Sequence, residues 1–136
     1  MLRMSHARIA IIGGTGQLGA AIARRLAKAG RSVIIGSRDP AKAATTAAAL
    51  GSELGRSLEG VANATAAAQG EIVIVAVPFA SQEATLKEIA PHVGGKIVVD
   101  TTVPLMPPKV MRVQLPSEGS AAVRAQRILG EGVRVV

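Results

Sequence analysis

Short apolar runs rich in Val and Ile alternate with amphipathic or alanine-rich stretches along most of the chain. Such runs, bounded by Gly, Ser and Asp, are typical of buried strands. The weakest apolar pattern among them lies at residues 56–60. We expect strands at residues 8–12, 32–37, 56–60, 71–77, 95–102 and 132–136.

Helical periodicity fills the stretches between these runs. Apolar side chains recur every fourth residue from Leu18 to Leu26 while charged ones fall between, which predicts an amphipathic helix that ends at Gly30. Asp39 and Pro40 predict the cap and the first residue of a second helix, which stops near Gly51. Further helices are expected at residues 61–69, 81–90 and 121–129, and a proline-rich loop is expected at residues 103–119.

Strands that are apolar on both faces and alternate with helices favour a parallel sheet covered on both sides. With right-handed crossovers, this order predicts an α/β, Rossmann-like, doubly wound parallel sheet. No internal linker or repeat interrupts the pattern, so we expect one nucleotide-binding domain over residues 1–136, ending within the sixth strand.

The composition narrows the range of functions. The chain has 136 residues, 49% of them hydrophobic, which is enough for a packed core. It has no Cys, so disulfides, thiolate metal sites and cysteine nucleophiles are excluded. It also lacks Tyr and Trp, and Phe79 is its one aromatic residue among Phe, Tyr and Trp. Short-chain dehydrogenases are therefore excluded, because they need a tyrosine acid.

The charge balance is basic, with 16 Lys and Arg against 9 Asp and Glu and a formal net charge of +7. These cations are dispersed, apart from a cluster at helical spacing between Arg24 and Arg31, which indicates a solvated helix face or a field that steers an anionic ligand. We expect no nucleic-acid partner and no membrane span, and we expect a cytoplasmic protein because the N-terminal residues do not resemble a signal peptide.

The sequence GGTGQLG, from Gly13 to Gly19, lies between the first strand and the first helix. It fits a dinucleotide loop in two registers, with Gly13 or Gly14 as the first glycine and Gly16 and Gly19 as the others. In such loops one glycine permits the tight turn, Gly16 lets the backbone approach a pyrophosphate, and Gly19 lets the helix pack closely. The helix N-terminus then attracts the anion.

The end of the second strand indicates which dinucleotide binds. NAD sites place an acid about 20 residues after the glycines, whereas this chain has Ser37 and Arg38 there. A hydroxyl and a guanidinium suit a 2′-phosphate, and Lys42 adds charge one turn into the next helix. Asp39 is the alternative acid, but Pro40 follows it, so we interpret it as the helix cap. The prediction is NADP.

The ends of the fourth and fifth strands face the same crevice in this fold. Val77 and Pro78 are expected near the nicotinamide, and Phe79 is either a packing residue or a cofactor contact. Asp100 is a candidate acid, but a turn residue at the end of a strand is the preferred interpretation. We predict no catalytic side chain and no metal site.

In these motifs the chain resembles the F420-dependent NADP oxidoreductases, which use coenzyme F420, an 8-hydroxy-5-deazaflavin. The matching segments are IAIIGGTGQLG, VIIGSRDPAKA, IVIVAVPF, GKIVVDTTVPL and GSAAVRAQRILGEGVRVV. The resemblance implies hydride transfer between NADP(H) and the deazaflavin, a small-molecule co-substrate. It also implies three groups of cofactor-binding residues: Thr15, Gly16, Gln17 and Leu18 at the pyrophosphate, Ser37, Arg38 and Lys42 at the 2′-phosphate, and Val77, Pro78 and Val103 near the nicotinamide.

Two departures from the family matter. Members often carry an aromatic-x-His pattern after the proline of the fourth strand, where this chain has Phe79-Ala80-Ser81. Members also continue past the sixth strand into a domain that completes the deazaflavin site. We therefore expect this chain to bind NADP but to reduce the deazaflavin poorly, and to cover its open sheet end through a homodimer or a missing segment.

Two alternatives remain open. One is a non-catalytic NADP-binding sensor or regulatory module. The other is a fragment of an imine or pyrroline-carboxylate reductase, a class that shares the Val-Pro signature of the fourth strand. Turnover with a hydride partner, measured against simple NADP(H) binding, separates the sensor from the enzyme.

Overall fold

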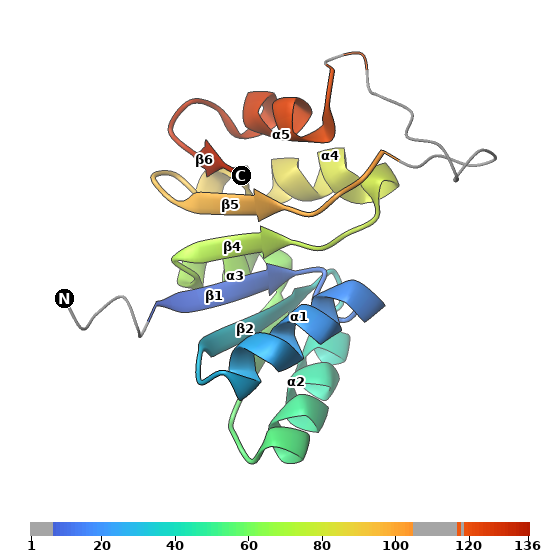
Figure 1. Ribbon diagram of the computed structural model, residues 1–136, viewed down its shortest axis with the longest axis vertical. Coiled ribbons are helices and arrows are strands. Elements are labelled where there is room, and N and C mark those ends of the chain that lie inside the picture. The colour runs from blue at the N-terminus through green and yellow to red at the C-terminus, as the bar shows by residue number, and fades with distance from the viewer. Residues whose placement is uncertain (1–6, 105–116, 118) are drawn as a thin grey trace.

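The structure is a computed structural model that describes residues 7–104, 117 and 119–136. Within these residues, six strands form one sheet in the order β3-β2-β1-β4-β5-β6, and every neighbouring pair is parallel (Figure 1). The strands are β1 (Arg8–Ile12), β2 (Ser32–Ser37), β3 (Glu59–Ala62), β4 (Ile72–Val75), β5 (Ile97–Asp100) and β6 (Arg134–Val135). This order confirms the predicted doubly wound, Rossmann-like fold.

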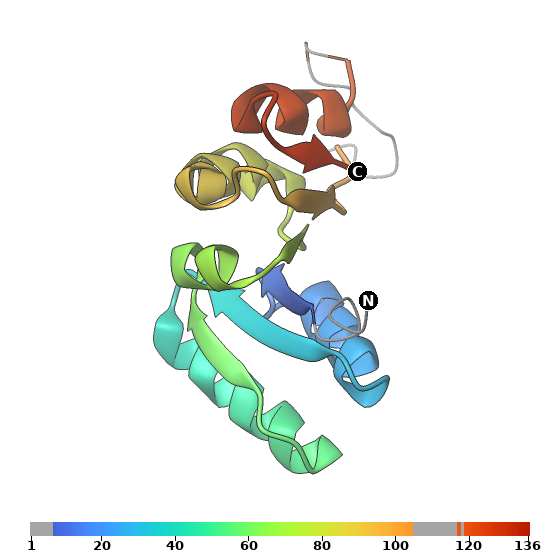
Figure 2. The same ribbon diagram turned by 90° about the vertical axis from the view of Figure 1, so that its left-hand side faces the viewer.

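Helices connect the strands and lie on both faces of the sheet, as Figures 1 and 2 show from two sides. They are α1 (Gln17–Lys28), α2 (Pro40–Leu54), α3 (Asn63–Gln69), α4 (Phe79–Ile89) and α5 (Ala121–Leu129), with a short 3-10 helix η2 (Ala90–His92) after α4. Alternation along β1 divides the core: Ile9 and Ile11 pack with α1 and α2, whereas Ala10 and Ile12 pack with α3, α4 and α5.

The two faces are covered unequally. In Figure 1, α3 and α4 lie behind the sheet, and α5 lies beyond β6 at the upper edge and packs with the same core cluster. The helices α1 and α2 pack on the other face, over β1, β2 and β3. On the face that carries α1 and α2, the described residues only half-bury the apolar side chains of β4 and β5, which are Ile72, Ile74, Ile97 and Val99. Among the described residues, helices therefore cover both sides of the half of the sheet formed by β1, β2 and β3, whereas one side of β4 and β5 is covered only in part.

The boundaries of β3 differ from the prediction. The strand lies at Glu59–Ala62 and α3 begins at Asn63, whereas the sequence pattern indicated a strand at 56–60 and a helix from residue 61. The reason is close packing: a Cβ on Gly60 would overlap the carbonyl of Ala43 in α2. This close packing requires glycine at position 60, inside β3. Glycine has a low strand propensity, so the sequence pattern of this strand is weak and its boundaries were misplaced.

The helix α2 also runs further than expected. It continues past Gly51, where we predicted its end, to Leu54, and Gly55 follows in the left-handed region with φ 65°. Gly51 is buried because the carbonyl of Arg56 lies against it, so it marks packing and not the end of the helix.

Smaller differences affect three other elements. The helix α4 starts at Phe79, two residues before the predicted boundary, and β4, β5 and β6 are shorter than the apolar runs that predicted them. Most of the predicted loop at 103–119 lies outside the described residues.

Candidate functional site

The glycine loop joins β1 to α1 at the carboxyl edge of the sheet. Gly13 has φ 76°, and a Cβ there would lie 2.7 Å from the carbonyl oxygen of Ala76, just after β4. A Cβ on Gly19 would lie 2.5 Å from the carbonyl oxygen of Gly13. Glycine is therefore required at both positions. At Gly13 the backbone turns tightly against the end of β4, and at Gly19 the helix α1 packs directly on the loop.

The N-terminus of α1 is open to an anion. Gly16 is its N-cap, no side chain caps it, and its first turn has no acidic residue. The first amide N–H groups of a helix have no partner within the helix and carry a partial positive charge. Gly16 itself is exposed, and a Cβ there would have only the Gly13 carbonyl oxygen near it, at 3.5 Å. The loop therefore presents donors to open space.

A pocket of about 280 Å³, called here the first pocket, lies between this loop and the end of β2. It is lined by Gly13, Thr15, Gly16, Ser37, Arg38, Asp39, Lys42, Asn63, Ala76, Val77, Pro78, Ser81 and Thr85.

The hydrogen bonds at the end of β2 separate the roles of its polar residues. Ser37 is 6% exposed, and its Oγ accepts a hydrogen bond from the Asp39 amide at 3.1 Å, which leaves its hydroxyl proton for a ligand. Asp39 Oδ1 accepts from the amides of Ala41 at 3.0 Å and Lys42 at 3.5 Å, so the predicted role of Asp39 as the cap of α2 is confirmed.

Two cations face the same pocket. Arg38 and Lys42 are exposed, and within the described part of the chain neither forms an ion pair. Together with the Ser37 hydroxyl they make a basic, donor-rich corner in which the one carboxylate, Asp39, is directed at its own helix. This corner suits a phosphate more than a ribose diol.

A second pocket of about 390 Å³ continues the crevice towards β5. It is lined by Gly16, Gln17, Leu18, Ala76, Val77, Pro78, Phe79, Thr101, Thr102 and Val103. Its rim is apolar and open, with Leu18 54% and Val103 50% exposed. Gly16, Val77 and Pro78 line both pockets, so a long ligand can cross from one to the other.

The crevice contains all but one of the predicted site residues. Gly13, Thr15, Gly16, Ser37, Arg38, Lys42, Val77 and Pro78 line the first pocket, and Gln17, Leu18 and Val103 line the second. Gly14 lines neither pocket: it is buried, and its amide donates to the Gly36 carbonyl oxygen at 2.9 Å.

Sequence reasoning missed three polar residues of the first pocket, namely Asn63, Ser81 and Thr85. Asn63 is 1% exposed, and its Oδ1 accepts from the Gly13 amide at 3.3 Å. It directly follows β3, so a correct boundary for that strand would have placed it at the carboxyl edge beside Ser37.

Comparison with known proteins gives the family. Residues 8–104 match the family described as NADP oxidoreductase, coenzyme F420-dependent. The chain belongs to this family. It is 42% identical over 142 residues to the F420-dependent NADP reductase of Methanothermobacter thermautotrophicus, covering 99% of this chain and 61% of the relative. It is 39% identical to the protein of the same name from Methanocaldococcus jannaschii, covering 91% of this chain and 59% of the relative.

Solved structures agree with this assignment. A crystal structure from Arthrobacter sp. FB24 that carries the name of an F420-dependent NADP reductase is 32% identical, with a TM-score of 0.79 over 95% of this chain and 60% of that one. Pyrroline carboxylate reductase from Plasmodium falciparum, solved with NADP bound, shares the fold alone, at 18% identity and a TM-score of 0.63 over 96% of this chain and 41% of that one. This member of the F420-dependent family thus spans about 60% of the length of the relatives it matches.

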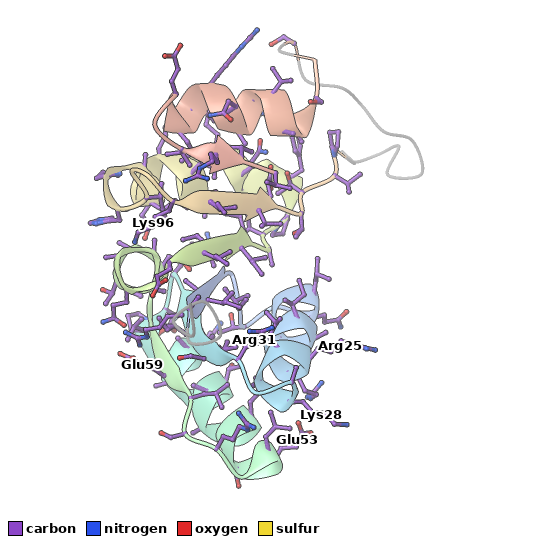
Figure 3. All side chains as sticks on the ribbon, turned by 60° about the vertical axis from the view of Figure 1, so that its left-hand side comes forward. Arg25, Lys28, Arg31, Glu53, Glu59 and Lys96 are labelled. Atoms are coloured by element: carbon purple, nitrogen blue, oxygen red, sulfur yellow. The ribbon has the colours of Figure 1, made fainter. Side chains whose placement is uncertain are left out.

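Most other charged groups lie away from the crevice. Figure 3 shows Arg25 and Lys28 projecting from α1 into solvent, near the end of the helix that is remote from the glycine loop. Lys96 caps α3, donating to the carbonyl oxygens of Ala67 at 2.7 Å and Ala68 at 2.9 Å, and burial lowers the pKa of its amine. The basic cluster that the sequence showed on α1 is therefore an exposed helix face.

No helix within the described ranges is both long and apolar enough to cross a membrane. The same residues contain no group of three or more His, Asp or Glu side chains placed to hold a metal ion.

Proposed function

We propose that this chain is the NADP(H)-binding part of an oxidoreductase that transfers a hydride between NADP(H) and the deazaflavin coenzyme F420. The observation that carries the proposal is the corner formed by Ser37, Arg38 and Lys42, with Asp39 committed to capping α2. The deazaflavin is proposed from the names of the relatives, and NADP is proposed from the residues that line the crevice.

The glycine loop fits the pyrophosphate of a dinucleotide. The uncapped N-terminus of α1 offers amide donors, and Gly16 leaves open space in front of them. Thr15 and Gln17 flank the same point and add a hydroxyl and an amide. Gly16 lines both pockets, so a pyrophosphate held by these groups would lie where the two pockets meet.

The corner at the end of β2 fits the 2′-phosphate that distinguishes NADP from NAD. Ser37, Arg38 and Lys42 line this corner and would hold the phosphate: the Ser37 hydroxyl would donate a hydrogen bond, and the Arg38 guanidinium and the Lys42 amine would supply positive charge and further donors. An NAD site would instead aim a carboxylate at the ribose diol, and Asp39 Oδ1 already accepts two amide hydrogen bonds.

The second pocket fits the nicotinamide end. Val77, Pro78 and Val103 give it apolar walls, which exclude water on the side of the protein and hold a planar ring by shape. When NADPH is bound, it supplies the hydride itself, so the protein needs no acid or base for that step. The part of this chain is to bind, orient and shield.

Titration of the purified chain with NADPH and NADH, followed by an assay of NADPH oxidation with coenzyme F420, tests the proposal. We expect NADPH to bind at least about tenfold more tightly than NADH, since a phosphate bound by charged groups contributes about 1.5–3 kcal/mol. Equal affinities would contradict the NADP corner. Tight NADPH binding without turnover, next to an active full-length relative, would favour a nucleotide-binding module that does not catalyse the reaction on its own.

A further inference from the structure

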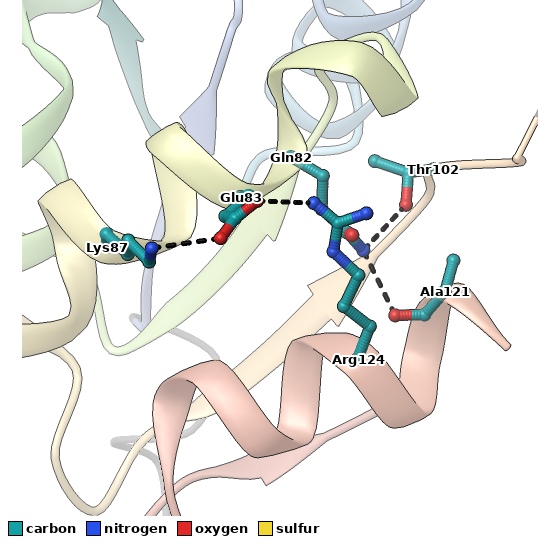
Figure 4. Close-up of polar contacts among 6 residues, drawn as sticks. All are labelled: Gln82, Glu83, Lys87, Thr102, Ala121 and Arg124. Carbon is teal, nitrogen blue, oxygen red and sulfur yellow. Dashed lines mark hydrogen bonds and ion pairs between the residues drawn. The ribbon is translucent and has the colours of Figure 1, made fainter. Parts of the chain in front are cut away.

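One amide side chain joins three segments behind the second pocket. Gln82, on α4, is completely buried, and its Nε2 lies 2.6 Å from Asp100 Oδ2, 3.0 Å from Thr102 Oγ1 and 3.0 Å from the Ala121 carbonyl oxygen. Figure 4 shows this amide directed from α4 towards Thr102 and the first turn of α5. A single side chain therefore connects α4, the end of β5 and the start of α5.

The other end of this amide has no partner among the described residues. Gln82 Oε1 is buried and accepts no hydrogen bond from any residue that the structure describes. Burying an unpaired carbonyl oxygen costs free energy, and such groups are rare enough to need an explanation. Turning the amide over would not help, because the oxygen would then face the carboxylate of Asp100. The orientation of the side chain thus lets Nε2 donate hydrogen bonds, while Oε1 is left without a donor among the described residues.

The groups that accept from Gln82 hold the wall of the second pocket. Asp100 Oδ1 accepts from the Thr102 amide at 3.0 Å, and its Oδ2 accepts from the Thr102 hydroxyl at 3.0 Å. Thr101 is held from the other side, since its hydroxyl donates to the Val75 carbonyl oxygen at 2.8 Å. Residues 101–103 line the second pocket, so the Gln82 amide lies directly behind that wall.

Contacts on the neighbouring turn of α4 fix α5 at the same place. Arg124 donates to Glu83 Oε2 at 3.0 Å, and its guanidinium lies 5.1 Å from the centre of the Phe79 ring, which itself lines the second pocket. Lys87 pairs with the other Glu83 oxygen at 2.9 Å, as Figure 4 shows. These contacts keep the Ala121 carbonyl within reach of Gln82.

We propose that Gln82 is a positioning residue for the nicotinamide end of the dinucleotide: its amide sets the place of residues 101–103, which form the wall against the ring. The inference rests on the proposed function and adds to it a residue that lines neither pocket. It predicts that loss of the amide weakens binding at the ring end and leaves the phosphate end unchanged.

Gln126 on α5 is a matched control. Its Nε2 donates to the carbonyl oxygens of Gly130 and Val133 at 2.8 Å each, and its Oε1 accepts from the Val135 amide at 3.4 Å. It is therefore also a helical glutamine with three hydrogen-bond contacts, but it holds β6 and lines neither pocket. Gln82→Met and Gln126→Met remove equal numbers of contacts from two places.

The test compares two ligands. 2′,5′-ADP reaches only the phosphate and adenosine end of the crevice, whereas NADPH also occupies the ring end. For Gln82→Met we expect the Kd of NADPH to rise about tenfold, which corresponds to about one hydrogen bond of positioning energy, with the Kd of 2′,5′-ADP unchanged. Gln126→Met is expected to change neither Kd. Asp100→Asn keeps the contact of Gln82 with Ala121 and serves as a milder variant if Gln82→Met does not fold; its effect has the same direction and is smaller.

Hydrogen exchange separates this inference from the proposed function. In the ligand-free Gln82→Met chain, and in Asp100→Asn, we expect faster exchange of the Thr102 amide, with no such change in Gln126→Met. If the wild type bound neither 2′,5′-ADP nor NADPH, the proposed function would fail, and exchange alone would decide whether Gln82 holds the wall. Unchanged exchange at Thr102, or an equal rise of both dissociation constants in Gln82→Met, would overturn the inference.

Discussion

Asn63 and Gly13 are 50 positions apart in the sequence, yet Asn63 Oδ1 accepts the Gly13 amide hydrogen at 3.3 Å. The contact connects the start of α3 to the tightest point of the glycine loop, where the backbone has a positive φ. Asn63 directly follows the edge strand β3, so a residue at one edge of the sheet helps to fix the glycine loop that follows β1.

Replacing Asn63 by Ala tests this contact. The change leaves the Gly13 amide without its acceptor in a partly buried position, so we expect a loss of about 1–3 kcal/mol in the free energy of unfolding. NADPH affinity is expected to fall as well, because the loop loses its support. Thermal unfolding and an NADPH titration measure both effects. Thr65→Ala, at an exposed position on the same helix, is the control, and an equal effect of the two changes would contradict the role of Asn63.

Arg38→Ala tests the choice of dinucleotide. We expect NADPH binding to weaken by about 1.5–3 kcal/mol, the range for hydrogen bonds to charged groups, and NADH binding to stay nearly constant. Isothermal titration with both nucleotides gives the two numbers. Arg25→Ala removes an exposed arginine of α1 and should alter neither. A matching loss of NADH affinity in Arg38→Ala would mean that Arg38 contacts a part common to both nucleotides.

Gly16→Val tests where the phosphates bind. The backbone of Gly16 has φ −76°, and a Cβ there meets no protein atom closer than 3.5 Å, so valine should leave the fold intact. Its side chain would occupy the space before the N-terminus of α1, and we expect NADPH binding to be abolished. Gly94→Val places the same side chain where nothing lies within 4 Å and is the control. Retained NADPH affinity in a folded Gly16→Val chain would place the phosphates elsewhere.

Glu83→Gln tests the contribution of the exposed ion pairs between α4 and α5 through its pH dependence. The hydrogen bond from Lys87, followed by the charges of Lys87 and Arg124, lowers the pKa of Glu83 below its ordinary value. The folded-state pKa is lower than the unfolded one, so the stabilisation is complete above the unfolded pKa and is lost as pH falls through the folded pKa.

We therefore expect wild type to melt slightly above Glu83→Gln near neutral pH, with the two melting temperatures converging in acid below the folded-state pKa. The difference should be small because the carboxylate is exposed and screened by water. A difference that persists unchanged in strong acid would show that packing, and not charge, explains it.

The sequence pattern predicts the strands that form continuous apolar runs, and it fails where packing between distant segments sets the boundaries of an element. The apolar runs of β1, β2 and β4 identify these strands directly, and the glycines identify the loop. The β3 strand was misplaced because Gly60 is required by the close approach of α2, a contact that local propensity does not record. That error hid Asn63.

Gln82 shows a second limit of sequence reasoning. In the sequence, Gln82 looks like an ordinary polar residue of the helix α4. It hydrogen-bonds to α5, through Ala121, which lies 39 positions later. A single sequence gives no sign of that contact, because hydrophobic periodicity reports which face of a helix is apolar and not what a polar residue on that face meets. Asp39 was predictable, by contrast, since a cap and its helix are local.

The position of β1 at the centre of the sheet also has a consequence for the order in which the chain can fold. One edge of β1 pairs with β2 over Arg8–Ile11, whereas its other edge pairs with β4, starting with Ile9 opposite Ile72. On the ribosome, β1, β2 and β3 can assemble early, but the second edge of β1 stays bare until β4 emerges. Ala76, against which Gly13 turns, directly follows β4. The crevice that contains the predicted site residues is therefore complete only when the two halves of the sheet join along β1.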